Sequence, residues 1–260
     1  MRDRSRAASS STSTSRRIRS LRGIAAWLED VGIASLLPGA DLVLPSVWEA
    51  VAGTREVEWG VERDDGKLEF TPEMALCWRW KDELPARGDA LVGKHFGRWA
   101  AVLAPWAIPP AYAAAAERRE SLSELQREVA DAVREHGACT GPQLRELLGA
   151  EKRLVDGAVV ALQRALVLTN SHLVEQRQGW GAIAVDRVDR LWELPAVDEP
   201  ELELARIVLA SSGELSAADL GGALGWRLRP ARLALDRLVE LGEARVRTAE
   251  VELYDVAATA

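Results

Sequence analysis

The sequence Thr140-Gly-Pro-Gln-Leu-Arg-Glu-Leu-Leu-Gly149 has the form of a short capped helix. Thr140 and Gln143 stand three positions apart, as in a capping box, where each side chain bonds the backbone N–H of the other residue. The leucines fall on one helical side, and glycine commonly ends a helix because it adopts the left-handed conformation freely. These residues predict a helix that begins after Thr140 and ends before Gly149.

The segments on either side complete a larger unit. Helical apolar spacing extends over residues 125–136 before the capped helix and over residues 155–166 after it. Strand-like residues 166–169 and 182–185 follow, with a glycine-rich turn between them. Three helices and a strand pair are typical of a winged helix-turn-helix module.

The same plan recurs towards the C-terminus. Ser216 with Asp219 predicts another capped helix, which Gly225 ends, and residues 244–247 and 251–255 have strand character. A longer and less regular copy comes first in the chain. Its predicted elements are a helix over 18–30, a helix over 47–52 capped by Ser46 and Glu49, a helix from Thr71 to Trp80, and a hairpin of 91–96 and 99–104 around Gly97.

We therefore predict an α+β protein, mainly helical, built of three tandem winged helix-turn-helix modules. A chain of 260 residues has room for three small domains. The expected divisions are a disordered basic tail at 1–17, an N-terminal module at 18–117, a middle module at 121–194, a linker at 195–200 and a C-terminal module at 201–260.

The charge is unevenly distributed along the chain. The net charge of −7 argues against a protein that coats nucleic acid through bulk charge alone. Residues 1–22 nevertheless carry seven arginines and one aspartate, which leaves the rest of the chain at −13. The Ser/Thr run at 9–15 has no apolar residue to bury, which predicts disorder. A solvated bacterial tail is favoured over an organellar transit peptide.

Other classes of protein lack support in the sequence. Two cysteines, Cys77 and Cys139, and three histidines cannot form a disulfide framework or a zinc cluster, and no phosphate- or dinucleotide-binding fingerprint is present. We therefore expect no metal and no cofactor. The uncharged stretch Trp99–Ala116 is interrupted by three prolines, which predicts a strand and a proline-rich connector rather than a membrane span. Without an apolar secretory segment at the N-terminus, we expect a cytoplasmic protein.

One segment carries a family resemblance. Trp78-Arg-Trp-Lys-Asp-Glu-Leu-Pro-Ala-Arg-Gly88, continuing to Gly93-Lys94, resembles bacterial winged-helix proteins related to the AlkZ-type DNA glycosylases, and Pro45–Gly53 fits the same group. The resemblance spans roughly residues 20–255. It implies three winged helices folded into a C that holds duplex DNA. It also implies chemistry that depends on a Gln-hydrophobic-Gln or Gln-hydrophobic-Asp motif near the N-terminus.

On that pattern, the motif falls on Ser35, Leu36 and Leu37. Leucine cannot orient or activate a water molecule, and the serine has no base beside it, so the resemblance does not carry glycosylase chemistry to this chain. If bases were nevertheless excised, the carboxylates to test as the water activator would be Asp30, Asp41 and Glu49.

The candidate DNA contacts are basic side chains on the expected helices. The third helix of a winged-helix module usually reads the groove, and in the last module its outer face carries Arg229, Arg232 and Arg237 beside Asp236. Further candidates for a positive groove are Arg79, Lys81 and Arg98. In the middle module the corresponding face is expected to be buried against a neighbouring module; it consists of Arg153, Gly157, Val160 and Arg164.

Tryptophans offer a second kind of contact, because indoles stack on unpaired bases. The ten tryptophans, against two phenylalanines and two tyrosines, instead favour an ordinary core role for these side chains. The residues in question are Trp78, Trp80, Trp99 and Trp106.

The favoured interpretation is a winged-helix protein that binds double-stranded DNA without a catalytic centre. One alternative is an AlkZ-type glycosylase that acts on alkylated or crosslinked bases. Another is a protein-interaction scaffold, because acidic winged helices often bind a protein partner. A positive groove would favour either DNA-binding interpretation, whereas a neutral or negative groove would favour the scaffold.

Overall fold

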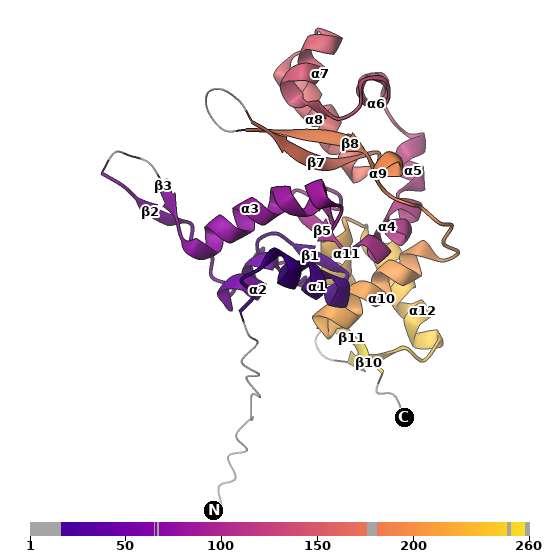
Figure 1. Ribbon diagram of the computed structural model, residues 1–260. Coiled ribbons are helices and arrows are strands. Elements are labelled where there is room, and N and C mark those ends of the chain that lie inside the picture. Colours follow the sequence, from indigo (N-terminus) through magenta and orange to yellow (C-terminus); the bar gives the residue numbers. More distant parts are fainter. Residues whose placement is uncertain (1–16, 65, 67, 176–180, 249–250, 258–260) are drawn as a thin grey trace, which may run out of the picture.

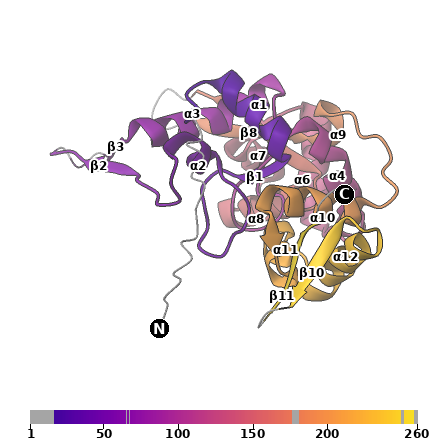
Figure 2. The same ribbon diagram turned by 90° about the horizontal axis from the view of Figure 1, so that it is seen from below.

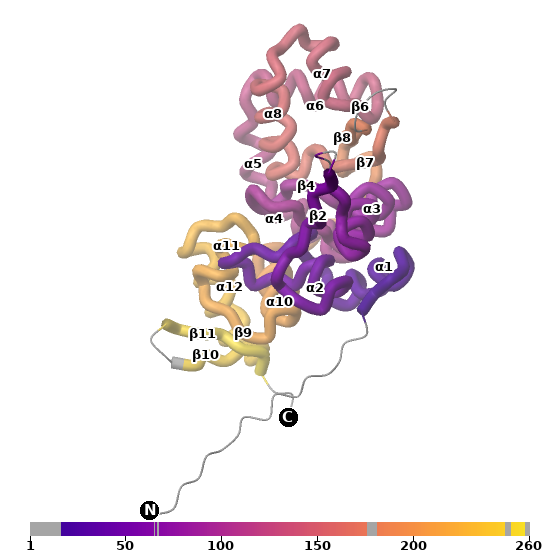
Figure 3. The backbone as a smooth tube through the Cα atoms, turned by 90° about the vertical axis from the view of Figure 1, so that its left-hand side faces the viewer, coloured from indigo at the N-terminus to yellow at the C-terminus, as the bar shows by residue number. Residues whose placement is uncertain are grey.

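The computed structural model describes residues 17–257 apart from 65, 67, 176–180 and 249–250, so nearly all of the predicted tail lies outside the described residues. The fold is α+β, as predicted, with helices in the larger share. In Figure 3 the N-terminal part occupies the centre, the middle part lies at one end and the C-terminal part lies beside the centre.

The N-terminal part contains a small sheet flanked by helices (Figure 1). Ser20, Ser46 and Thr71 cap its three helices through their side-chain oxygens. The last helix continues to Arg87, past the predicted end at Trp80, because its apolar side repeats as far as Leu84. The elements are α1 (Leu21–Val31), β1 (Ile33–Ser35), α2 (Val47–Ala52), β2 (Gly60–Glu62), β3 (Leu68–Phe70), α3 (Pro72–Arg87), β4 (Leu91–Gly93) and β5 (Ala101–Leu103).

The hairpin of β2 and β3 projects from the body of the molecule, as Figures 1 and 2 both show. The predicted hairpin around Gly97 is present, with β4 and β5 paired antiparallel. The proline-rich connector that follows is helical. Its prolines lie in the first turns of helices, where a residue without an N–H is tolerated. The connector contains η1 (Pro105–Ala107), α4 (Ile108–Ala114) and α5 (Ala116–Glu120).

The middle part has the predicted three helices and strand pair. Thr140 and Gln143 form a capping box, and Gly149 ends the capped helix in the left-handed conformation. The predicted strands also pair: Leu168 lies opposite Arg187 at one end and Val174 lies opposite Ala182 at the other. The elements are α6 (Glu124–His136), β6 (Cys139–Thr140), α7 (Gly141–Leu148), α8 (Lys152–Arg164), β7 (Leu168–Val174), β8 (Ala182–Arg187) and α9 (Val188–Leu191).

The C-terminal part repeats this order. Ser216 and Asp219 form the expected capping box, and Gly225 ends the capped helix. The terminal hairpin pairs Ala244 with Val256 and Thr248 with Glu252. The elements are α10 (Pro200–Ser212), β9 (Glu214–Leu215), α11 (Ala217–Leu224), α12 (Leu228–Glu240), β10 (Ala244–Thr248) and β11 (Glu252–Val256).

The three parts are joined in different ways. A six-stranded sheet of order β1-β5-β4-β7-β8-β6 runs from the N-terminal part into the middle part, where Val92 of β4 pairs with Asn170 of β7. The C-terminal part has its own sheet of order β10-β11-β9. It shares one buried apolar cluster with β1, β5 and α4, in which Leu103 and Ile108 pack with Leu220 and Leu235. The hairpin of β4 and β5, which belongs to the N-terminal part, therefore contacts both other parts.

We expect each of the two capping boxes to contribute to the free energy of unfolding. Replacing Thr140 or Ser216 with alanine should lower the free energy of unfolding by about 1 kcal/mol each, because an N-terminal helix N–H loses its acceptor. Urea unfolding of the purified variants measures this change. Ser211→Ala, inside α10, is the matched control and should be close to neutral. Equal effects of all three substitutions would contradict the prediction.

Candidate nucleic-acid interface

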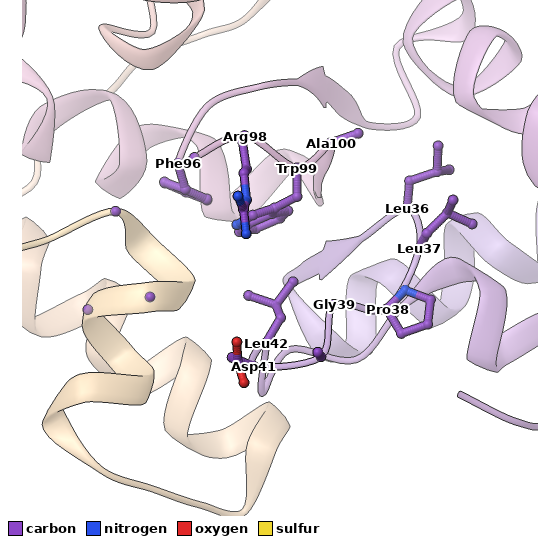
Figure 4. A pocket seen from close by; sticks show the side chains of 15 residues that line it. Leu36, Leu37, Pro38, Gly39, Asp41, Leu42, Phe96, Arg98, Trp99 and Ala100 are labelled. Atoms are coloured by element: carbon purple, nitrogen blue, oxygen red, sulfur yellow. The ribbon is translucent and has the colours of Figure 1, made fainter. Parts of the chain in front are cut away.

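A cavity of about 590 Å³ opens where the N-terminal and C-terminal parts meet (Figure 4). One wall is the loop after β1, another is the turn between β4 and β5, and the third is the end of α11. The lining residues are mostly apolar or glycine: Leu36, Leu37, Pro38, Gly39, Ala40, Asp41, Leu42, Phe96, Gly97, Arg98, Trp99, Ala100, Gly221, Gly222 and Gly225.

Backbone hydrogen bonds hold the first two walls together. Leu36 N donates to Ala100 O at 2.8 Å, and Leu36 O accepts from Trp48 N at 3.1 Å, so the loop is tied to the hairpin and to α2. The third wall lies very close to the hairpin. A Cβ on Gly225 would lie 1.8 Å from Phe96 O, and Gly225 has a φ of 65°. Only glycine allows this approach of α11 to the turn.

Two of the three positions that the family resemblance assigns to chemistry lie at this cavity. Ser35, the third, is fully buried, and its hydroxyl donates to Pro45 O at 3.5 Å. Leu36 and Leu37 line the cavity and offer no polar atom in their side chains. Among the lining residues, Asp41 is the only carboxylate and is exposed.

The same cavity contains one of the predicted DNA contacts. Arg98 points from the hairpin turn into the cavity in Figure 4 and is the only cation among the lining residues. It is exposed, and it forms no ion pair with any described carboxylate. Its five N–H groups therefore remain available to a ligand.

Arg79 and Lys81 lie elsewhere, at a cavity of about 670 Å³ between α3 and the hairpin of β7 and β8. Both are already engaged by neighbours on α3. Arg79 pairs with Glu83 at 3.6 Å, while Lys81 Nζ lies 2.7 Å from an Asp82 oxygen and 4.7 Å from the centre of the Trp78 ring.

The three arginines of α12 are exposed, as the helical pattern implied, but differ in their partners. Arg232 pairs with Glu252 at 3.0 Å, and Arg237 pairs with Glu240 at 3.0 Å. Arg229 has no partner among the described residues. The six predicted contacts thus do not line one common cavity.

Two further arginines, which the sequence did not indicate as DNA contacts, lie near the cavity of about 590 Å³. Arg118 of α5 donates from Nη1 to Arg164 O and from Nη2 to Gly225 O, both at 3.1 Å. Arg164, at the end of α8, donates to Gly97 O at 3.5 Å. Burial and then the nearby charge of Arg164 lower the pKa of Arg118. Arg118 falls between two predicted modules, where no periodic pattern marked it.

The outer face of α8 is not buried, contrary to expectation. Arg153, Gly157 and Arg164 are exposed, and a Cβ on Gly157 would meet no atom within 4 Å. The expectation was wrong because the middle part contacts its neighbour through its sheet, at β7, and through the last turn of α8, at Gln163 and Arg164, rather than along the outer face of this helix.

The tryptophans divide between core and surface. Trp48 and Trp80 are buried in the N-terminal core, as the core interpretation predicted. Trp78 instead forms an aromatic cluster with Phe70 and Trp59, at centroid separations of 5.6 and 6.4 Å. Trp106 is 45% exposed and donates to Glu29 O at 3.0 Å.

The described part of the chain contains neither a metal-binding group of side chains nor a membrane-spanning helix. No group of three or more His, Cys, Asp or Glu side chains there is arranged to hold a metal ion. None of the described helices has the length and apolar character needed to cross a membrane.

Comparison with known proteins gives structural relatives and a family. The sequence matches no curated protein. The fold is similar to that of the DNA glycosylase AlkZ of Streptomyces sahachiroi, with a TM-score of 0.53 and 13% sequence identity over 93% of this chain and 65% of that one. At this identity the likeness concerns the fold alone, and the chain spans less than two thirds of its relative. A sequence model of the AlkZ-related family matches residues 18–207, most of the length, and the chain therefore belongs to the AlkZ-related family.

Proposed function

We propose that this protein binds duplex DNA through three winged-helix modules, divided as the sequence predicts, and does not excise bases. The AlkZ-related family and the likeness to a DNA glycosylase support an association with DNA. Exposed arginines without carboxylate partners support phosphate contact, because local cations can bind a backbone even when the protein is acidic overall.

The proposal that the protein does not excise bases rests on the geometry of Ser35, Leu36 and Leu37. A glycosylase needs a group that orients or activates a water molecule beside the base. Ser35 is buried with its hydroxyl directed to a backbone carbonyl, and both leucines present only carbon to the cavity. Binding at this cavity would therefore not lead to excision.

Gel-shift titrations with intact, abasic and alkylated duplexes, at two salt concentrations, test binding. Strand-cleavage analysis of the same samples tests excision. We expect binding that weakens steeply with salt, as counterion release requires, and base release no greater than in a heat-inactivated control. Base release above that control would contradict the proposal, whereas absence of binding at low salt would favour the protein-interaction scaffold.

A second candidate function is an AlkZ-type glycosylase with a relocated water activator. The observation that favours it is Asp41, the one carboxylate that lines the cavity. If excision were found, Asp41→Asn should abolish it while duplex affinity stays the same. Asp30→Asn is the matched control, because Asp30 does not line this cavity.

Arg229 and Arg232 test the role of α12 in binding. Loss of both side chains in an Arg229→Ala/Arg232→Ala variant should weaken duplex binding and reduce the slope of log K against log salt by about one unit for each phosphate that is no longer neutralised. The pairing of Arg232 with Glu252 predicts that Arg229 contributes more. Unchanged affinity of the double variant would show that α12 does not touch the duplex.

A further inference from the structure

Three arginines lie where all three parts of the protein meet. Arg118 reaches the end of α8 and the end of α11, Arg164 reaches the turn between β4 and β5, and Arg98 follows directly in that turn. We call Arg98, Arg118 and Arg164 the junction arginines. Their hydrogen bonds link Gly97 and Gly225, which both line the cavity of about 590 Å³.

The junction arginines form no ion pair with a described carboxylate. Glu117, Asp198, Glu199 and Glu201 line a cavity of about 930 Å³ together with Arg118, but none of them pairs with it. Arg118 is partly buried, and the charge of Arg164 lies near enough to lower its pKa. Like charges that lie near each other repel, and a bound anion removes this repulsion.

Another arginine in the chain bonds the carbonyls at a helix end and also has a carboxylate partner. Arg190 donates to Val133 O and Arg134 O at the end of α6, much as Arg118 does at the end of α8. Arg190 also pairs with the buried Asp186 at 2.8 Å. Asp186 thus neutralises Arg190, whereas no described carboxylate forms an ion pair with a junction arginine.

We propose that the junction arginines bind a phosphate group, which in the complex is a backbone phosphate of the duplex beside the cavity. This inference rests on the proposed function and adds to it the residues that orient DNA at the cavity. The planar guanidinium is suited to the role because its paired N–H groups match two phosphate oxygens. Arg118 and Arg164 keep N–H groups beyond those that bond backbone carbonyls, and Arg98 keeps all of its own.

The test compares the full chain with an Arg98→Gln/Arg164→Gln variant, because both side chains are exposed and their loss should not unfold the protein. Arg145→Gln is the matched control. Arg145 donates to a helix carbonyl, Gly141 O, and has no partner among the described carboxylates, but it lies on α7, far from α11 in Figures 1 and 3. We expect the double variant to bind duplex about tenfold more weakly and to lose about one unit of salt slope, while the control binds as the unaltered chain does.

Two additional measurements identify the bound group. A scan of duplexes with single neutral methylphosphonates should find a position that weakens binding of the unaltered chain and has no effect on the double variant. Inorganic phosphate, compared with chloride at equal ionic strength, should raise the melting temperature of the unaltered chain but not that of the double variant.

The outcomes separate this inference from the proposed function. If the unaltered chain binds duplex and the double variant matches it in affinity and salt slope, the inference is overturned and the function stands. If no duplex binds but inorganic phosphate stabilises only the unaltered chain, the phosphate site stands and the function fails. If neither ligand binds, both fail.

Discussion

Gly225→Ala should lower the free energy of unfolding by about 3 kcal/mol, a large effect for the addition of one methyl group. The new Cβ would lie 1.8 Å from Phe96 O, so either α11 or the turn between β4 and β5 must move. Gly225 also has a φ of 65°, in the left-handed region that alanine adopts only at a cost. Because the contact joins the C-terminal part to the hairpin, packing between them should loosen.

Gly149→Ala separates these two causes. Gly149 ends α7 just as Gly225 ends α11, with a φ of 59°, but a Cβ there would meet no atom within 4 Å. Its replacement should therefore lower the free energy of unfolding by only about 1 kcal/mol, the cost of placing alanine in the left-handed conformation. Urea unfolding of both variants measures the difference. Equal losses would show that the close approach to Phe96 contributes nothing.

These two glycines also show how far the sequence predicts the fold. Both helix ends were predicted, because a glycine after an apolar helical run is a local signal. The capping boxes at Thr140 and Ser216 were predicted for the same reason and are confirmed. The contact of Gly225 with Phe96 joins residues far apart in the chain, and no local pattern encodes it.

The junction between the N-terminal and middle parts was likewise beyond sequence reasoning. The pairing of Val92 with Asn170 merges two predicted modules into one sheet, and each strand by itself was expected to belong only to its own hairpin. The error about α8 has the same origin. Small and apolar residues on an outer face suggested burial, but which face meets a neighbour depends on the joined sheet.

The candidate site was predicted only in part. Arg229 and Arg232 were identified from helical spacing, which a single helix contains in full, and both are exposed. Ser35, Leu36 and Leu37 were identified from the family resemblance, and the family assignment is confirmed. Arg118 was missed because its place beside Gly225 depends on how three separate segments pack. A site between parts is visible only when their arrangement is known.

The joined sheet contains a buried histidine that should make the protein sensitive to acid. His95 is fully buried between the N-terminal and middle parts. Its Nδ1 lies 3.0 Å from Gln163 O, and its Nε2 lies 3.3 Å from Thr169 Oγ1. Gln163 also accepts a hydrogen bond from Lys94 N and donates one to Asn170. These neighbours are neutral, so nothing compensates a positive charge on the ring.

We expect the free energy of unfolding to fall by about 3 kcal/mol as the pH drops from about 6.5 to about 4. Burial lowers the pKa of His95 to about 4, despite opposing hydrogen bonds from backbone groups. The unfolded chain has the ordinary histidine pKa and takes up the proton first, so stability is fully present above pH 6.5 and is lost towards pH 4. His95→Asn, whose amide can still donate to Gln163 O, should be less stable at pH 7, but its free energy of unfolding should no longer fall between about pH 6.5 and about pH 4. His172→Asn, at an exposed position of β7, should show the same fall as the unaltered chain. Urea unfolding from pH 4 to pH 7 compares the three proteins, and a slope that persists in His95→Asn would assign the acid sensitivity to other groups.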